Sequence, residues 1–338
     1  MQAAVLKADG SLVVESVPAP HPEPGEVVLR VRDCGICGSD LHAAAHPWQL
    51  PPDSIMGHEF SGEVAELGSG VTGWREGERV VSLPYASCGT CPACVAGDSM
   101  RCPSLRGIGL GQLPGAYAEF VRADPKNLLR IPDGVSFRTA ALVEPLAVGL
   151  RGVRRSRLAP GGSCVIMGAG PIGLVTLLWA RQQGAATVVV SEMAAGRAQL
   201  AQRLGAAAVV NPSDGDPAAV LKERSGAEAA LIFECVGVKG TLNAALTMAG
   251  TRGEVIVLGV CTDMDEIFPL AAILKELEVK FILGYTPEEF AMALGALADG
   301  SIDVQPLITD VIDLAELPAT FQRLTRPSTQ AKVLLEFA

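Results

Sequence analysis

The sequence contains few aromatic residues, few charged residues and no long apolar run. Aromatic side chains account for 4% of the 338 residues and charged ones for 19%, whereas 49% of the residues are hydrophobic. This composition excludes a disordered chain and is typical of a folded protein with a sizeable core. No apolar run reaches the roughly 18 residues that a membrane-spanning helix needs, so we expect no membrane partner. The length favours two domains over one.

Positive charge is scarce as well. The formal net charge is −10 and the isoelectric point is near 5.0, which argues against nucleic acid or an anionic membrane surface as a partner. The first residues contain no basic stretch followed by an apolar one, so we expect no signal peptide. The nine cysteines are an odd number and are clustered as metal ligands would be. This fits a reducing compartment better than a disulfide scaffold, and we expect a cytoplasmic protein.

Metal-binding side chains gather in the N-terminal part of the chain. Cys37, His58 and Glu59 offer the sulfur, nitrogen and oxygen donors of a catalytic zinc site, which keeps one position open for water or substrate. Asp40 can orient the imidazole ring without binding the metal itself. Two alternatives remain for this segment: a satisfied histidine beside a buried cysteine, or a redox pair between Cys34 and Cys37.

A second cluster contains only cysteines. Its spacing, C-x2-C-x2-C-x7-C, places four thiolates on one short segment, and four sulfur ligands make a closed tetrahedral zinc site with a structural role. An iron–sulfur cluster and four unrelated core cysteines are the alternatives. The four residues are Cys88, Cys91, Cys94 and Cys102.

The pattern of the chain changes near residue 150. Before it, alternating apolar and polar residues lie between Pro- and Gly-rich turns, which is typical of a barrel-like β domain. After it, apolar strands alternate with helices, as in a doubly wound parallel sheet. We therefore expect a β domain over residues 1–150, completed by residues 286–338, and a nucleotide-binding domain over residues 151–285. The strands of the second domain are expected at 163–167, 186–190, 229–234, 254–259 and 279–284.

A glycine-rich turn follows the first of these strands and precedes a helix. Gly168, Gly170 and Gly173 form the pattern G-x-G-x-x-G, whose glycines allow a tight turn and the close approach of a pyrophosphate to backbone amides. Glu192 ends the next strand and is placed to bind the adenosine ribose. Its charge would repel a 2′-phosphate by roughly 4 kcal/mol at about 4 Å and an effective dielectric of about 20. NAD is therefore favoured over NADP, although Ser191 or Arg197 could contact a phosphate.

In their order along the chain, these motifs resemble the zinc-dependent medium-chain alcohol dehydrogenase superfamily over essentially the whole sequence. The segments 37–42, 57–59 and 144–148, with the four-cysteine cluster, look like the threonine, sorbitol and 2,3-butanediol dehydrogenase branch. Gly38 and Glu144 depart from the liver-type enzymes, which carry a basic residue and a zinc cysteine there, and both departures agree with the polyol branch. The resemblance implies an α/β protein: a GroES-like β-barrel catalytic domain plus a Rossmann domain.

The resemblance also implies cofactors and residue roles. It implies one catalytic and one structural Zn²⁺, and NAD. Cys37 and His58 would bind the catalytic zinc, with Glu59 as third ligand in some members and Glu144 in others. The residues expected to be catalytic are Ser39, His42 and Asp40. Ser39 and His42 would relay the alcohol proton through a cofactor ribose hydroxyl towards solvent, and Asp40 would orient the zinc-binding imidazole. The expected cofactor contacts are Gly168, Gly170, Ile172, Gly173, Glu192, Arg197, Leu258, Gly259, Val260, Gly284 and Tyr285.

These motifs predict an oxidoreductase that interconverts a secondary alcohol or vicinal diol and its ketone by NAD-linked hydride transfer. The few aromatic residues, and the lack of an evident carboxylate-binding arginine in the zinc segment, favour a neutral small-molecule substrate. His46 and Trp48 could each contact the substrate or only pack in the loop. Two alternatives stay open: an NADP-dependent biosynthetic ketone reductase of the same fold, and a non-catalytic nucleotide-binding interaction module. The resemblance further implies a homo-oligomer, either a tetramer or a dimer.

Overall fold

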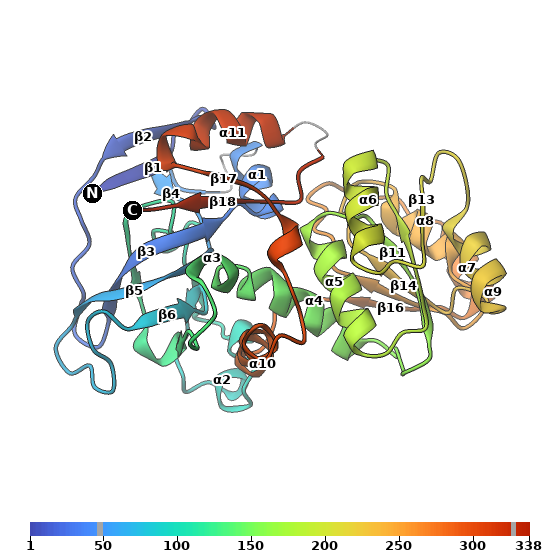
Figure 1. Ribbon diagram of the computed structural model, residues 1–338, viewed down its shortest axis with the longest axis horizontal. Helices are drawn as coiled ribbons and strands as arrows, with labels where there is room; N and C mark the ends of the chain where they lie inside the picture. Colours follow the sequence, from blue (N-terminus) through green and yellow to red (C-terminus); the bar gives the residue numbers. More distant parts are fainter. Residues whose placement is uncertain (46–49, 326–328) are drawn as a thin grey trace. The chain divides into compact units, whose positions relative to one another are not determined.

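The computed structural model describes residues 1–45, 50–325 and 329–338 (Figure 1). His46 and Trp48, for which substrate contact was left open above, lie outside the described residues. The chain forms two compact units. Unit 1 comprises Met1–Glu144, Thr286–Ser328 and Lys332–Ala338, and unit 2 comprises Pro145–Tyr285 and Thr329–Ala331.

Unit 1 is built mainly from β-strands. The strands are β1 (Gln2–Leu6), β2 (Leu12–Ser16), β3 (Val27–Gly35), β4 (Ser54–Ile55), β5 (Glu59–Leu67), β6 (Arg79–Ser82), β7 (Tyr85–Ala86), β8 (Arg106–Gly107), β9 (Phe120–Ala123), β10 (Leu128–Arg130), β17 (Ile308–Ile312) and β18 (Lys332–Glu336). The largest sheet has the order β10-β6-β5-β3-β18-β17, with β9 also paired to β3. Strand β3 pairs antiparallel with both β5 and β18, so segments far apart in the sequence meet on one sheet.

Short helices connect the strands of unit 1. They are α1 (Gly38–Ala45), α2 (Pro92–Val95), α3 (Phe137–Ala140), α10 (Pro287–Ala298) and α11 (Leu317–Leu324), with the 3-10 helices η2 (Ser99–Arg101), η3 (Pro125–Asn127), η4 (Gln305–Leu307) and η5 (Leu314–Glu316). Helix α10 starts with a capping box between Thr286 and Glu289, and Pro287 occupies its first turn. The core of the unit is apolar and includes Leu29 and Val31 of β3 and Leu335 of β18.

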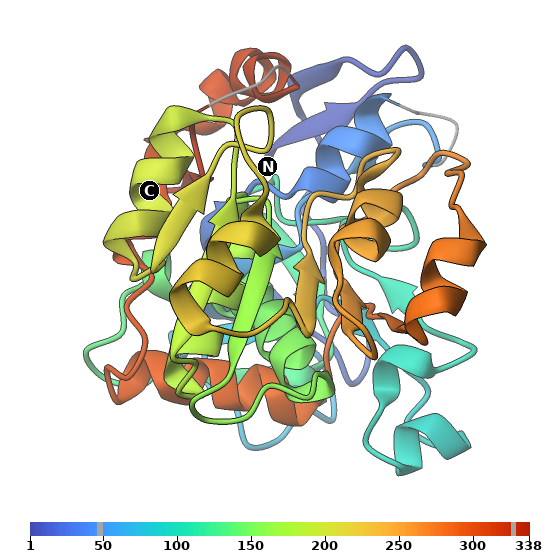
Figure 2. The same ribbon diagram turned by 90° about the vertical axis from the view of Figure 1, so that its right-hand side faces the viewer.

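Unit 2 is a parallel sheet with helices on both faces (Figures 1 and 2). Its strands are β11 (Ser163–Met167), β12 (Thr187–Ser191), β13 (Ala208–Val210), β14 (Leu231–Glu234), β15 (Glu254–Val257) and β16 (Glu278–Phe281). Its helices are α5 (Pro171–Gln182), α6 (Ala195–Arg203), α7 (Pro217–Ser225), α8 (Thr241–Met248) and α9 (Pro269–Lys275), while α4 (Val143–Arg155) runs across the boundary between the units.

The strand order of unit 2 is β13-β12-β11-β14-β15-β16, and every neighbouring pair is parallel. This is the Rossmann order 3-2-1-4-5-6, in which ligands bind at the carboxyl ends of the strands where the order reverses. Strand β14 is buried along its whole length, as expected for a strand covered on both faces. The predicted doubly wound parallel sheet is therefore confirmed. Among the described residues, no helix is long and apolar enough to span a membrane.

Candidate active site

Strand pairing in unit 1 brings the three predicted catalytic metal ligands together. Cys37 follows β3, whereas His58 and Glu59 stand at the start of β5, and the register pairs Gly35 with Glu59. One donor atom from each of Cys37, His58 and Glu59 lies within 4.8 Å of the other two. A thiolate, an imidazole and a carboxylate are zinc ligands, and three protein ligands leave a position for substrate. The donor set therefore fits a catalytic zinc.

The predicted metal loop is in part helical. Ser39, Asp40 and His42 all lie in helix α1. The Asp40 carboxylate accepts a hydrogen bond from the backbone N–H of Cys37 at 3.0 Å, and a side chain in the first turn that satisfies the N–H before the helix stabilises its start. A helix at this point fixes the spacing between the cysteine and the residues that follow it.

Asp40 is buried, and its carboxylate contacts Nδ1 of the His58 ring. Its Oδ1 lies 3.3 Å from His58 Nδ1, and its Oδ2 accepts a hydrogen bond from the Tyr117 hydroxyl at 2.6 Å. Burial alone would lower the pKa of His58, but the charges of Asp40 and Cys37 outweigh it and raise this pKa well above its ordinary value. A carboxylate at Nδ1 fixes the ring orientation and leaves Nε2 for a metal. Tyr117, which no sequence motif indicates, holds the carboxylate in place.

The two predicted relay residues lie on the same helix. The Ser39 hydroxyl oxygen is 3.4 Å from Nε2 of His58, which places it beside the metal-binding atoms. Nδ1 of His42 is buried and has no hydrogen-bond partner among the described residues. Buried polar groups are nearly always satisfied, so a nitrogen without a partner indicates a missing ligand or water.

Glu59 is held by a lysine that the sequence motifs do not reveal. The Lys332 ammonium donates to both carboxylate oxygens of Glu59, at 2.7 and 2.6 Å, and both side chains are 1% exposed. A Cβ at Gly35 would lie 2.0 Å from Glu59 Oε2, so only glycine leaves room for the carboxylate. Glu144, the alternative third ligand, begins helix α4 and acts electrostatically on Lys332. The donor atoms that meet within 4.8 Å include Glu59 and not Glu144.

The four-cysteine cluster forms a separate lobe between β7 and β8. The sulfur of Cys88 lies 3.5 Å from that of Cys102 and 4.0 Å from that of Cys94. Backbone N–H groups of Thr90 and Cys91 lower the pKa of Cys88 to about 6, which favours the thiolate that binds metal. Four sulfurs within 4.8 Å of one another fit a tetrahedral structural zinc. The lobe has few buried side chains, and helix α2 has none.

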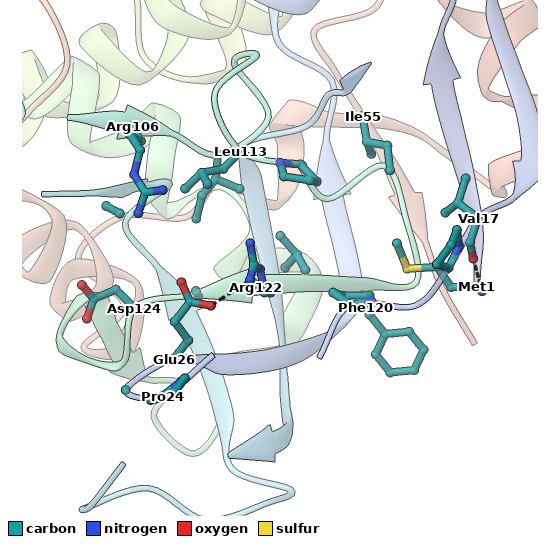
Figure 3. A pocket seen from close by; sticks show the side chains of 18 of the residues that line it. Met1, Val17, Pro24, Glu26, Ile55, Arg106, Leu113, Phe120, Arg122 and Asp124 are labelled. Carbon is teal, nitrogen blue, oxygen red and sulfur yellow. Dashed lines mark hydrogen bonds and ion pairs between the residues drawn. The ribbon is translucent and has the colours of Figure 1, made fainter. Parts of the chain in front are cut away.

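A cavity of about 480 Å³ also lies in unit 1, against β9 and the proline-rich segment that precedes β3 (Figure 3). Its walls are apolar at Ile55 and Leu113, and Arg122 in it pairs with Glu26 at 3.3 Å. None of the predicted metal, relay or cofactor residues lines it. This cavity is therefore not the candidate active site.

The predicted dinucleotide turn of unit 2 has the geometry that a pyrophosphate needs. Gly168 has a φ of +88°, and a Cβ at Gly173 would lie 1.9 Å from the carbonyl oxygen of Gly168, so both positions require glycine. A Cβ at Gly170 would meet nothing within 4 Å. No side chain caps helix α5, whose first turn includes Ile172. The open space and the uncapped helix N-terminus together fit a phosphate group.

The carboxylate of Glu192 lies at the same turn. It accepts hydrogen bonds from the backbone N–H of Ala169 at 2.8 Å and of Ala194 at 2.7 Å, one on each oxygen. Arg197 is directed elsewhere, because its Nε donates to the carbonyl of Gln330 at 2.9 Å. Ser191 is buried. The negative charge therefore faces the turn, as the sequence predicts for a ribose site.

A buried glutamate shapes the neighbouring turn after β15. The side chain of Glu234 accepts from the N–H groups of Val236 and Gly237, and its carbonyl accepts from Leu258 and Gly259. Gly259 has to be glycine, because a Cβ there would lie 2.2 Å from the nitrogen of Gly237. The remaining predicted cofactor contacts differ in exposure: Val260 is exposed, Gly284 is half-buried and Tyr285 is fully buried.

Comparisons with known proteins agree with this geometry. The family model of the alcohol dehydrogenase GroES-like domain matches residues 23–133, and that of the zinc-binding dehydrogenases matches residues 171–299. The chain is 36% identical over 318 residues to 2-dehydro-3-deoxy-L-galactonate 5-dehydrogenase of Pseudoalteromonas atlantica, covering 93% of this chain and 92% of that protein. It is 31% identical over 325 residues to sorbitol dehydrogenase of Bos taurus, covering 94% and 91%.

Solved structures resemble the chain over its whole length. The structure of 2R,3R-butanediol dehydrogenase of Bacillus subtilis has a TM-score of 0.89 and 34% identity, covering 100% of this chain and 99% of that one. A protein of Sinorhizobium meliloti 1021, described as a zinc-binding dehydrogenase and bound to NADP, has a TM-score of 0.89 and 34% identity, covering 99% of both chains. The chain therefore belongs to the zinc-dependent medium-chain alcohol dehydrogenase superfamily, in the branch that contains the sorbitol and butanediol dehydrogenases.

Proposed function

We propose that the protein is a zinc-dependent oxidoreductase that interconverts a secondary alcohol or vicinal diol and the corresponding ketone, with a nicotinamide dinucleotide as hydride acceptor or donor. The observation that carries this proposal is the meeting of Cys37, His58 and Glu59 donor atoms within 4.8 Å. The glycine turn of unit 2 supports it, because its open space fits a dinucleotide pyrophosphate.

Cys37, His58 and Glu59 would hold the catalytic zinc, and Cys88, Cys91, Cys94 and Cys102 the structural one. A bound catalytic zinc supplies Lewis acidity, which lowers the pKa of a coordinated alcohol. The Asp40 carboxylate at Nδ1 keeps the His58 ring in the orientation that ligation requires.

Ser39 and His42 would handle the proton of the substrate hydroxyl. Ser39 lies beside the metal-binding atom of His58, so its hydroxyl can accept that proton. An imidazole has a pKa near the operating pH, which suits His42 to pass the proton on towards solvent. The buried, unpartnered Nδ1 of His42 supports a role in contact with a bound molecule.

NAD is the cofactor that the site favours. The Glu192 carboxylate is fixed at the turn by two backbone N–H groups, and its charge would repel a 2′-phosphate. The relatives act on molecules of different charge, one a sugar acid and another a polyol, so the chemistry shared with this chain is oxidation at a secondary alcohol carbon.

Metal analysis, with reduction of NAD⁺ and NADP⁺ by a panel of secondary alcohols, diols and sugar acids, tests the proposal. We expect two zinc ions per chain and a kcat/KM with NAD⁺ at least about 100-fold above that with NADP⁺, because the repulsion estimated at Glu192 exceeds two tenfold steps. A preference for NADP⁺ would support the biosynthetic reductase instead. One zinc per chain and no turnover with any alcohol would contradict the enzyme proposal.

We also propose a cytoplasmic homo-oligomer that forms through unit 2. Strand β16 is the edge of its sheet, and the N–H groups of Glu278 and Ile282 donate to β15, so those of Val279 and Phe281 face the open edge. Phe281 is 70% exposed, and helix α9 of the same unit buries no residue. Exposed apolar edge strands pair with other chains unless they are protected, and a second copy would bring an identical edge. The reduced thiolates of the zinc sites suit a reducing compartment.

Phe281→Glu is expected to break this assembly, because each of the two copies then brings a negative charge into the apolar contact. Light scattering coupled to gel filtration should give a dimer or tetramer for the natural chain and a smaller species for the variant. Val95→Glu, at an exposed apolar residue of unit 1, is the matched control and should leave the mass unchanged. An unchanged mass for Phe281→Glu would contradict the proposed edge.

A further inference from the structure

A buried lysine holds one predicted ligand of the candidate metal site, and the proposed reaction gives it no part. Lys332 stands at the start of β18 and is 1% exposed. Its ammonium donates to both oxygens of Glu59 and to the carbonyl of Ile36 at 3.0 Å. Lys332 therefore contacts one predicted ligand directly and the residue before another.

Burial of an ammonium group is unfavourable unless it is paired and hydrogen-bonded. Here the pairing uses a carboxylate that is also a metal donor, rather than a group with no other role. The charges of Cys37 and Glu144 act on Lys332 as well. The charge of Lys332 therefore acts on the metal site as well as on the stability of the sheet.

The Lys332 ammonium changes what Glu59 can offer a metal. Asp40 and Glu144 add negative charge near the thiolate and the carboxylate of the ligand set, but the ammonium contacts the Glu59 carboxylate directly. A carboxylate that already accepts two hydrogen bonds from an ammonium is a weaker electron donor to a metal, and an ammonium close by repels the metal itself.

We infer that Lys332 is a positioning residue that makes Glu59 a weak, exchangeable zinc ligand. The ammonium holds the carboxylate next to Cys37 and His58 and neutralises its charge, so that Glu59 can leave the metal when a substrate oxygen arrives. The absence of a side chain at Gly35 gives the carboxylate its space. This inference rests on the proposed function, in which these residues bind a catalytic zinc.

The alternative is a structural ion pair that only attaches β18 to β5. The two roles predict opposite changes in zinc retention. Loss of an ordinary supporting residue weakens metal binding, by about 10–100-fold for groups that orient a ligand. Loss of a cation that competes with the metal for Glu59 strengthens it.

The test compares Lys332→Met with Lys332→Arg in the zinc-loaded enzyme. We expect Lys332→Met to release catalytic zinc to the chelator 4-(2-pyridylazo)resorcinol at least about tenfold more slowly and to lose at least about tenfold in kcat, because Glu59 then stays on the metal. Lys332→Arg keeps the charge and can donate to both carboxylate oxygens, so it should release zinc at nearly the natural rate. The Cys37→Ser variant is expected to retain only the structural zinc, so its release rate gives the contribution of the four-cysteine site.

Cobalt substitution tests whether the effect passes through Glu59. The visible absorption of Co²⁺ at the catalytic site should change in Lys332→Met and stay unchanged in Lys332→Arg. In a Glu59→Gln background, adding Lys332→Met should not change the spectrum, because no carboxylate remains to bind. This double variant also removes both buried charges, and Lys332→Gln should behave like Lys332→Met if the latter does not fold.

The outcomes separate the two proposals. A natural enzyme with one zinc per chain would contradict the proposed function itself. Two zincs per chain, with equal or faster release from Lys332→Met, would overturn the role of Lys332 and leave the proposed function intact. A spectral change that persists in the Glu59→Gln background would also overturn it.

Discussion

Cys37→Ser is expected to remove one of the two zinc ions and to lower turnover by about a thousandfold or more. The thiolate is one of three donors, and a serine hydroxyl is a poor zinc ligand at neutral pH. Lewis-acid stabilisation contributes several kcal/mol, and each 1.4 kcal/mol is about tenfold in rate. Metal content by mass spectrometry and steady-state kinetics on the same sample measure both effects.

Cys34→Ala is the matched control for this prediction. Cys34 is the other cysteine of the C-x2-C pattern, is fully buried, and its thiol donates to the carbonyl of Gly35 at 3.7 Å. Burial raises the pKa of Cys34 well above its ordinary value, so it is a poor thiolate. The Cys34→Ala variant should therefore keep both zinc ions and most of its activity. Loss of activity with both zincs retained in Cys34→Ala would instead favour the redox-pair alternative.

Cys94→Ser is expected to remove the other zinc and to unfold the lobe between β7 and β8. Within this lobe only Ser99 and Cys102 are classed as buried over residues 88–102, so apolar packing contributes little to its stability. Structural zinc sites supply about 10–16 kcal/mol of apparent binding energy in small zinc-dependent folds, and most of the lobe's stability should depend on the metal. Limited proteolysis should show cleavage within residues 88–102 at least about 100-fold faster than in the natural protein.

Cys261→Ser controls for the loss of any thiol, because Cys261 is exposed and belongs to neither cluster. It should retain both zincs and the natural rate of proteolysis. The catalytic zinc should remain in Cys94→Ser, since its donors lie at or next to the ends of β3 and β5 in the main sheet. An intact, protease-resistant lobe in Cys94→Ser would contradict a structural zinc there.

The sequence by itself determined the parts of this protein that are local in the chain. The four cysteines fall within 15 residues of one another, so their spacing alone indicates a closed zinc site. The glycine turn is readable for the same reason, because a strand, three glycines and a helix follow one another directly. Five of the six strands of unit 2 are also readable, as apolar segments between turns, whereas β13 is only three residues long and was not predicted.

Helix α1 was not readable, although it bears Ser39, Asp40 and His42. It is only eight residues long and has a short apolar pattern, so periodicity gives little signal. Its start depends on a hydrogen bond that the backbone N–H of Cys37 donates to the Asp40 carboxylate, and such caps become evident only with coordinates.

The contacts that only the tertiary structure decided come from strand pairing. Lys332 lies 273 residues after Glu59, and the two meet because β18 and β5 both pair with β3. Tyr117 reaches Asp40 across 77 residues in the same unit. A lysine followed directly by three apolar residues in the final strand is a faint signal of a buried partner, but the sequence does not name that partner. Register between distant strands is set by burial and turn geometry over the whole sheet, and no local pattern contains it.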